Sequence, residues 1–177
     1  MQLKNKTAVI FGGSGAIGSA AAYALAREGA HVWLAARTQT RLDRVADRIR
    51  AAGGSASTLI FNALDESSPL PDLAHIDIAV NATGFMHDQG KRIEALTLAE
   101  FRLGLDPFLT AYFNIAKAVS PRMGGEHAGT MITVVAPAAN MAMPGHPGHI
   151  IGCAGTEAFT RALAAELGPK NIRVLCI

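Results

Sequence analysis

The sequence has little of the features that mark several specialised classes of protein. Cys153 and Cys176 are its only cysteines, which excludes a disulfide framework and favours a reducing compartment, so we expect a cytoplasmic protein. Its 16 basic and 14 acidic residues leave a net charge of only +2 and form no basic run. Neither a nucleic-acid partner nor a membrane-surface partner is therefore expected.

Long apolar runs, internal repeats and low-complexity segments are missing as well. No uninterrupted apolar stretch approaches membrane-spanning length, and no signal-peptide core follows the polar start around Lys4 and Lys6. Half of the residues are hydrophobic, which is typical of a folded chain rather than a disordered one. We therefore expect a single domain over residues 1–177 with a substantial core.

The stretch from Thr7 to Gly18 organises the rest of the chain. It reads T-A-V-I-F-G-G-S-G-A-I-G, and its apolar, β-branched start favours a strand that is buried on both faces. The segment from Ala20 to Arg27 is rich in Ala and Leu, which favours a helix. A strand, a glycine turn and a helix can place a phosphate group at the helix N-terminus, where free N–H groups and the helix dipole face the anion.

Two features of the N-terminal part of the chain indicate which ligand would bind. Gly13, Gly15 and Gly18 fit the G-x-G-x-x-G fingerprint of dinucleotide-binding folds, the alternative being a glycine-rich turn that binds nothing. Arg37 follows the second expected strand, close to the place where such folds meet the adenosine ribose. A guanidinium suits the 2′-phosphate of NADP, whereas an acid would suit the 2′-hydroxyl of NAD. We therefore expect NADP(H) rather than NAD(H), the alternative for Arg37 being a solvated arginine at a strand end.

Strand and helix patterns alternate along the whole chain. This alternation predicts a single α/β domain with a parallel, doubly wound sheet, the Rossmann fold. The expected strands span 8–11, 31–36, 56–61, 76–81, 130–135 and 172–177, the expected helices span 16–28, 40–52, 98–103, 107–119 and 150–167, and residues 86–94 and 137–148 are expected to be loops. Asp106 is expected to cap the helix that starts at Pro107.

These segments resemble those of the short-chain dehydrogenases/reductases. The resemblance covers nearly all of the chain, from Lys4 to Ile177, and is carried by F-G-G-S-G-A-I-G, A-A-R-T, D-I-A-V-N-A-T-G and T-R-A-L-A-A-E-L-G-P-K-N-I-R-V. It implies that the glycine turn holds the pyrophosphate and that Arg37 selects NADP. The residues that it assigns to the cofactor are Gly12, Ser14, Gly15, Ala16, Ile17, Gly18, Arg37, Thr38, Asn62, Ala63, Asn81, Ala82, Thr83 and Gly84.

The family's catalytic groups are replaced in this sequence. The resemblance implies a Ser, a Tyr, a Lys and an Asn, among which the Tyr protonates the carbonyl as hydride arrives. Alignment on the long C-terminal helix instead puts His149 at the Tyr place and Cys153 at the Lys place, while Ala136 and Phe108 fall at the Ser and Asn places. Only His149 retains the ability to transfer a proton near neutral pH. His149 is therefore the candidate catalytic acid or base, the alternative being a dead site in which it only begins the helix.

Two other interpretations of the same segment are possible. His146, His149 and Cys153 could bind a metal, or His149 could activate Cys153 as a nucleophile. No carboxylate obviously joins the first set, and a small buried residue is the commoner fate of a helix cysteine. We therefore expect no metal site.

The sequence also departs from the family outside the active site. The segment from Asp65 to Asp77 is short, so the helix between the third and fourth strands is expected to be lost or reduced to a turn. The sequence stops at the sixth strand, where the family continues with a nicotinamide clamp and a substrate lid, so either the protein lacks these segments or the sequence is incomplete. Without them the nicotinamide site would be open to water, which disfavours hydride transfer. Family members usually associate through the helices at 107–119 and 150–167, so a homodimer or homotetramer is expected.

The resulting hypothesis is an oxidoreductase-like protein that binds NADP(H) and transfers hydride to or from a carbonyl or alcohol at a non-standard site. Its substrate is a small molecule that the sequence does not identify. A non-catalytic NADP(H)-binding sensor or scaffold is one alternative. A non-redox isomerase or cyclase built in the same cleft is another.

Overall fold

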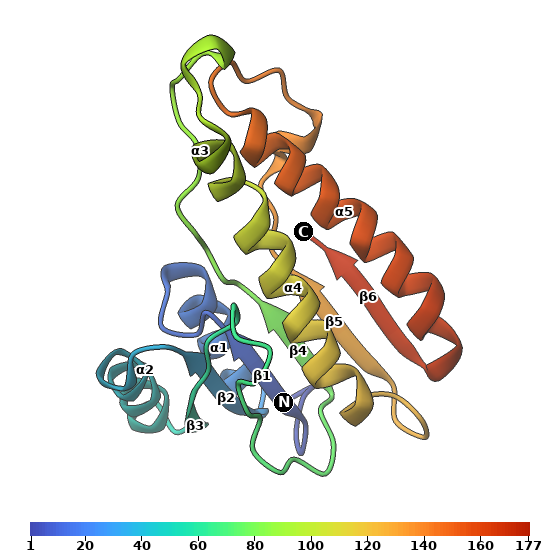
Figure 1. The fold of residues 1–177 in the computed structure, drawn as a ribbon. Coiled ribbons are helices and arrows are strands. Elements are labelled where there is room, and N and C mark those ends of the chain that lie inside the picture. Colours follow the sequence, from blue (N-terminus) through green and yellow to red (C-terminus); the bar gives the residue numbers. More distant parts are fainter.

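The structure is a computed structural model that describes all residues from 1 to 177. One six-stranded sheet with the order β3-β2-β1-β4-β5-β6 forms its centre, and all neighbouring strands are parallel (Figure 1). The strands are β1 (Thr7–Phe11), β2 (His31–Ala36), β3 (Ser55–Ile60), β4 (Ile78–Asn81), β5 (Gly129–Thr133) and β6 (Ile172–Cys176). The predicted doubly wound parallel sheet is therefore confirmed.

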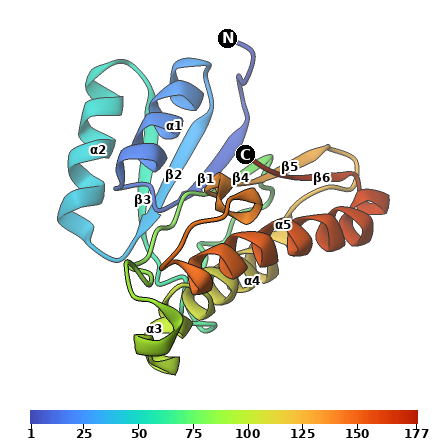
Figure 2. The ribbon, with the colours of Figure 1, turned by 90° about the horizontal axis from the view of Figure 1, so that it is seen from above.

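Helices cover both faces of this sheet (Figure 2). On one face lie α1 (Ala16–Arg27) and α2 (Gln39–Ala51), and on the other lie α4 (Asp106–Val119) and α5 (Pro147–Leu167). The short helix α3 (Leu98–Leu103) packs against α5. None of these helices has both the length and the apolar character that crossing a membrane requires.

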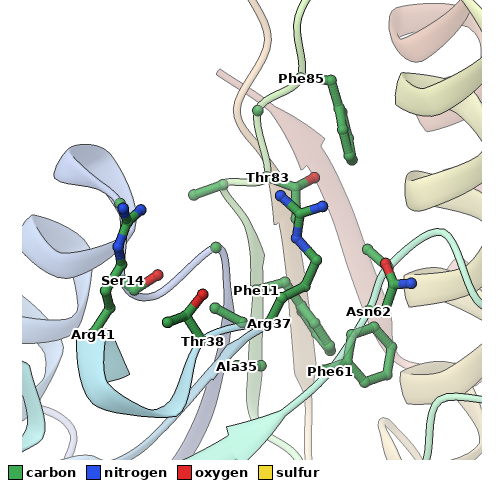
Figure 3. A pocket seen from close by; sticks show the side chains of 16 residues that line it. Phe11, Ser14, Ala35, Arg37, Thr38, Arg41, Phe61, Asn62, Thr83 and Phe85 are labelled. Atoms are coloured by element: carbon green, nitrogen blue, oxygen red, sulfur yellow. The ribbon is translucent and has the colours of Figure 1, made fainter. Parts of the chain in front are cut away.

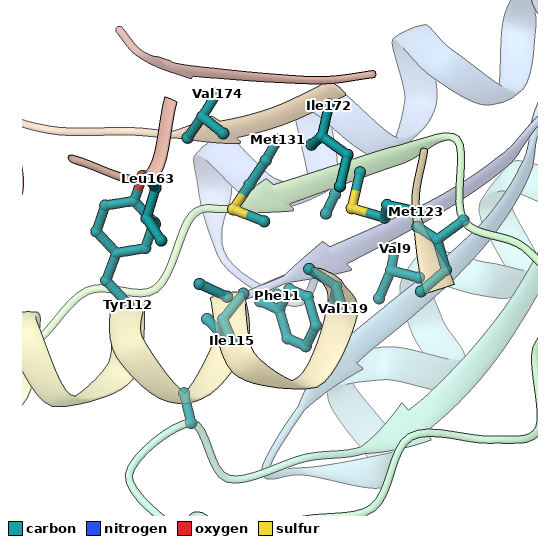
Figure 4. Packing of buried hydrophobic residues seen from close by; sticks show 14 of the residues in the cluster. Val9, Phe11, Tyr112, Ile115, Val119, Met123, Met131, Leu163, Ile172 and Val174 are labelled. Carbon is teal, nitrogen blue, oxygen red and sulfur yellow. The ribbon is translucent and has the colours of Figure 1, made fainter. Parts of the chain in front are cut away.

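The sheet separates two apolar clusters, because side chains alternate between the faces of each strand. In β1, Ala8 and Ile10 pack with the buried residues of α1 and α2, whereas Val9 and Phe11 pack with those of α4 and α5. Figure 4 shows the second cluster, in which Tyr112, Ile115 and Val119 of α4 lie against the sheet. The unbroken apolar run of β1 thus has a direct cause, since both of its faces are covered.

No helix forms between β3 and β4, as the short segment predicted. A right-handed crossover would place that helix on the α4 side of β2 and β3. Polar side chains stand on this face instead: His31 Nδ1 lies 2.6 Å from Ser55 Oγ, and His31 Nε2 lies 3.1 Å from Ser57 Oγ. These bonds satisfy polar groups on a sheet face that is only partly covered, so the strand composition matches the missing helix.

The observed ends of two helices correct the sequence predictions. α4 begins at Asp106 with Leu105 as its N-cap and without a side-chain cap bond, so the prediction that Asp106 caps this helix is wrong. Asp106 lies in the first turn instead, where a carboxylate is favoured by the helix dipole. α5 begins at Pro147 rather than Ile150, and a short 3₁₀ turn at Pro137–Asn140 interrupts the predicted loop. The fixed φ of Pro147 suits a first helical position, and the earlier start places His149 inside the first turn.

Candidate functional site

A cleft opens at the carboxyl ends of β1, β2, β3 and β4 (Figure 3). It lies where the strand order reverses between β1 and β4, which is the place where open α/β sheets bind ligands. The residues that line it are Phe11, Gly12, Ser14, Gly15, Ala35, Ala36, Arg37, Thr38, Arg41, Phe61, Asn62, Ala63, Ala82, Thr83, Gly84 and Phe85. The sheet therefore gathers turns that are far apart in the sequence into one site.

The glycine turn after β1 has the shape that a phosphate site requires. Gly12 has a φ of +76°, and a Cβ on it would overlap the Ala82 carbonyl oxygen and lie 2.9 Å from Thr83 N. α1 begins after Gly15 without a side-chain cap and has no acidic residue in its first turn. Its first N–H groups are therefore available to an anion, so the residues present fit the pyrophosphate of a dinucleotide.

Two arginines reach the same cleft. Figure 3 shows Arg37, at the end of β2, extending beside Thr83, and Arg41, in the first turn of α2, beside Ser14. No Asp or Glu is among the lining residues, so the usual carboxylate partner of a free ribose 2′-hydroxyl is missing. The sequence pointed to Arg37 but missed Arg41, whose place in the first turn of the next helix was the available signal.

Most of the residues predicted to bind the cofactor line this cleft, but four do not. Ala16, Ile17 and Gly18 lie in the first turn of α1 and are not among the lining residues. Gly18 supports the turn, because a Cβ there would overlap the Gly12 carbonyl oxygen. Asn81 lines the neighbouring cavity, and its Oδ1 accepts hydrogen bonds from Thr83 N at 3.1 Å and from Thr83 Oγ1 at 2.7 Å.

That neighbouring cavity contains all the residues that sequence alignment placed at catalytic positions. It shares Thr83 with the cleft, and the residues that line it are Asn81, Thr83, Phe108, Tyr112, Thr133, Val134, Val135, Ala136, His149, Cys153 and Thr156. Thr133 is only 2% exposed, and its Oγ1 has no hydrogen-bond partner in the protein. Thr133 Oγ1 is thus a polar group that a ligand in this cavity could satisfy.

Cys153 has the environment of a core residue. The pKa of its thiol is raised overall. Burial and the Glu157 carboxylate raise this pKa, and a hydrogen bond with the Ala136 backbone offsets part of the increase. His149 Nε2 lies 3.7 Å from Cys153 Sγ. A neutral, buried thiol is a poor nucleophile, so the structure does not favour the nucleophilic interpretation.

The structure gives no support to the metal interpretation of His146, His149 and Cys153. No group of three or more His, Cys, Asp or Glu side chains is arranged to hold a metal ion. His146 Nδ1 lies 3.1 Å from the Pro144 carbonyl oxygen, an acceptor, so this ring nitrogen acts as a donor and carries its proton there.

His149 lies among groups that shift its acidity in opposite directions. Burial lowers the pKa of His149, and the charges of His87 and His146 lower it further, whereas the Asp88 carboxylate raises it. The ring of His87 stacks on that of His149, with centroids 3.9 Å apart and planes inclined by 13°. Sequence reasoning treated His87 and Asp88 as part of a polar loop, and nothing in the sequence connected them to His149, which lies 61 positions after Asp88.

Comparison with known proteins identifies the family to which this fold and cleft belong. The family model for short chain dehydrogenases matches residues 6–177. The chain belongs to the short-chain dehydrogenase/reductase family. The resemblance inferred from the sequence motifs is therefore confirmed, and this family of oxidoreductases binds nicotinamide cofactors.

Individual family members show how far this relationship extends. The chain is 30% identical to a peroxisomal 2,4-dienoyl-CoA reductase of Pongo abelii, and the match covers 97% of this chain and 61% of that protein. It is also 30% identical to a 3-oxoacyl-[acyl-carrier-protein] reductase of Synechocystis sp., covering 97% of this chain and 72% of the reductase. The chain thus spans less than two thirds of one of these relatives.

A solved structure extends the comparison to three dimensions. L-Sorbose reductase of Gluconobacter frateurii, in complex with NADPH and L-sorbose, is 26% identical and superposes with a TM-score of 0.87. The match covers 99% of this chain and 70% of the reductase. The arrangement of helices and strands in this chain is therefore similar to that of the reductase.

Proposed function

We propose that this protein is an NADP(H)-dependent oxidoreductase that transfers hydride to or from a carbonyl or alcohol of a small molecule. The observation that carries the proposal is the cleft itself, in which Arg37 and Arg41 accompany the glycine turn and no carboxylate is present. Two guanidinium groups suit a ribose 2′-phosphate by charge and by hydrogen-bond geometry. The complex of L-sorbose reductase with NADPH provides a precedent among proteins of the same fold.

The residues of the cleft would bind the cofactor, and His149 in the neighbouring cavity would transfer the proton. The turn from Gly12 to Gly18 would hold the pyrophosphate, and Asn62, Ala63 and residues 82–84 would border the adenosine. When bound, the dinucleotide supplies or accepts the hydride. His149 would donate a proton to the carbonyl oxygen during reduction and accept one from the alcohol during oxidation. Ala136 and Phe108 offer no side-chain hydrogen bond to share this task.

Titration of NADPH and NADH against the parent and two arginine variants tests the cofactor assignment. We expect NADPH to bind the parent more tightly, and Arg37→Ala and Arg41→Ala each to weaken NADPH binding by about tenfold, because each removes a charge-assisted hydrogen bond. NADH binding should change little in either variant, since NADH has no 2′-phosphate. Calorimetry at fixed ionic strength measures all the affinities.

The exposed Arg44, one turn further along α2 and outside the cleft lining, supplies the control. Arg44→Ala removes the same charge and should leave both affinities within about twofold of the parent. Equal affinity of the parent for NADPH and NADH would exclude the assigned role of the two arginines. Failure to bind either nucleotide would exclude the proposed cofactor altogether.

A second candidate function rests on the replaced catalytic groups. Phe108, Ala136 and Cys153 leave His149 as the proton-transfer residue among the aligned positions in the cavity, which also suits a non-catalytic NADP(H) sensor or scaffold. NADPH binding without turnover in a screen of carbonyl and alcohol substrates would favour this alternative. Product formation without NADPH consumption would instead indicate a non-redox isomerase or cyclase.

We also propose that the chain forms a homodimer or homotetramer through α4 and α5. An exposed row of small residues runs along α5 and comprises Ala154, Ala158, Ala162 and Ala165. On α4, Phe113 is 50% exposed. A row without long side chains allows two helices to approach closely, and burying the phenyl ring adds apolar contact.

Sedimentation equilibrium tests this assembly. The parent should sediment as a dimer or tetramer at micromolar concentration, and Ala158→Arg should sediment as a monomer because the new charge falls on the contact face. Ala51→Arg places the same side chain at the exposed end of α2 and should leave the assembly intact. A parent that sediments as a monomer at all concentrations would contradict the proposal.

A cytoplasmic location also remains our proposal. It is supported by the two cysteines, which are both free in the structure, Cys153 being buried and Cys176 partly buried. Free thiols are the common state in a reducing compartment.

A further inference from the structure

A buried carboxylate holds the first turn of the helix that carries His149. Asp88 is 4% exposed, its Oδ2 accepts a hydrogen bond from Gly148 N at 2.8 Å, and its Oδ1 accepts one from His149 N at 2.8 Å. The N-cap residue His146 makes no side-chain cap bond to this helix. Asp88, which lies 61 positions before His149 in the sequence, therefore caps the N-terminus of α5 in place of a local side chain.

Three glycines make room for this carboxylate. A Cβ on Gly104 would overlap both Asp88 Oδ1 and His149 N, and a Cβ on Gly148 would overlap the Phe101 carbonyl oxygen. A Cβ on Gly152 would overlap the Gly104 carbonyl oxygen. The backbone at the end of α3 thus packs directly against the backbone at the start of α5, with the Asp88 carboxylate between them, which leaves His149 little freedom to move.

The residue before Asp88 holds the other side of His149. His87 Nδ1 donates a hydrogen bond to the Asp88 carbonyl oxygen at 3.0 Å, because a carbonyl can only accept. This bond fixes the plane of the His87 ring that stacks on His149. One short segment therefore contacts His149 twice, by a carboxylate at its backbone and by an imidazole at its ring.

We propose that Asp88 is a positioning residue for His149: its carboxylate fixes His149 in the first turn of α5 and places a negative charge beside it. The proposal deepens the proposed function, since it rests on His149 being the acid and base of that reaction. Asp88 itself points its two oxygens at backbone N–H groups and transfers no proton.

Asp88 is the only negatively charged group among the neighbours of His149 that shift its pKa. His87 and Asp88 face it from the segment after β4, His146 and Cys153 face it from its own helix, and Phe108 faces it from α4 without a charge. Tyr112 lines the same cavity, and its hydroxyl is bonded to Thr160 Oγ1 at 3.0 Å. Among these groups Asp88 alone raises the pKa of His149, whereas burial, His87 and His146 lower it.

Opposite charge changes on the two sides of His149 test the proposal. Asp88→Asn keeps the side-chain shape and removes the charge, so we expect the pKa of His149 to fall. His87→Phe keeps a stacked ring and removes a cationic neighbour, so the pKa of His149 should rise. The measurement is an NMR pH titration of the histidine ring signals in the full chain, with the His149 signal assigned by its loss in His149→Ala.

Asp72→Asn supplies the control, because Asp72 is an exposed carboxylate in the segment between β3 and β4. It should leave the His149 titration unchanged. A purely structural Asp88 would lower the stability in Asp88→Asn without moving the pKa of His149, and that result would overturn the proposal. If Asp88→Asn does not fold, the titration is repeated on Asp88→Ser, which also removes the charge and is smaller. Failure of both neutral variants to fold would assign Asp88 to structure alone and would also overturn it.

The pH dependence of kcat/KM then connects the titration to the reaction. For carbonyl reduction, the pH above which kcat/KM declines should move down in Asp88→Asn together with the pKa of His149. If the parent turns over no substrate, the proposed function fails, and the NMR titration still decides the role of Asp88. If the parent turns over substrate but the pH profile of kcat/KM is the same in Asp88→Asn, the positioning role fails while the proposed function stands.

Discussion

Gly12→Ala should weaken NADPH binding by about 100-fold, which corresponds to about 2.7 kcal/mol. Two costs combine at this position. A non-glycine residue is strained at a φ of +76°, and the new Cβ would overlap the carbonyl oxygen of Ala82. To relieve the overlap, the glycine turn must move away from the end of β4, which separates the two segments that face each other across the cleft. We also expect a loss of about 3 kcal/mol in the free energy of unfolding.

Gly53→Ala separates these two costs. Gly53 has a similar φ of +81°, but a Cβ there meets nothing within 4 Å. The Gly53→Ala variant should therefore be less stable by only about 1 kcal/mol in the free energy of urea unfolding, because the backbone strain is its only cost. It should bind NADPH as tightly as the parent. If Gly12→Ala matched Gly53→Ala in both stability and affinity, the close contact between the turn and β4 would not shape the site.

His149→Ala should lower the kcat of carbonyl reduction by about 100- to 10,000-fold, the range typical of a positioned acid or base. NADPH affinity should stay within about twofold of the parent, because His149 lies outside the cleft lined by the glycine turn. Steady-state kinetics and nucleotide titration on the same preparation separate the two effects. His127→Ala, which removes an exposed histidine in the turn before β5, is the matched control and should leave both values unchanged.

The same assignment fixes the sign of the pH dependence. Reduction needs the imidazolium form of His149 as the acid, so activity is present below the pKa of His149 and is lost as pH rises through it. Burial, His87 and His146 lower that pKa from the usual value of a histidine, so the loss of reduction with rising pH should begin at a lower pH than for an ordinary histidine, and oxidation should show the opposite dependence. Turnover in His149→Ala at the parent rate would show that another group or water supplies the proton.

The glycine turn and the strands around it were predictable because their signals are local. The apolar run from Ala8 to Phe11 must be covered on both faces, and the glycines that follow permit the φ of +76° that the turn adopts. Arg37 directly follows β2, a strand that the alternation of strands and helices predicted. Each of these inferences needs only the residues of one segment and the rules for joining parallel strands.

Tertiary structure alone decided the surroundings of the catalytic candidate. The sequence placed His149 at the family's Tyr position, but only the fold shows the stacked ring of His87 and the carboxylate of Asp88 beside it. The prediction that Asp106 is a helix cap was wrong for a related reason. Which residue caps a helix depends on the backbone at that point, and here Leu105 takes the N-cap position.

The sequence by itself thus determined the family, the parallel sheet and the glycine turn after its first strand. Hydrophobic periodicity, glycine conformation and motif spacing are properties of residues that are close in the sequence, so they can be recognised from the sequence alone. Only the tertiary structure brought Arg41 into the cleft and gathered Asp88 and His87 around His149. The acidity of a side chain depends on every charge and every apolar surface within a few ångströms, and packing selects those from distant parts of the chain.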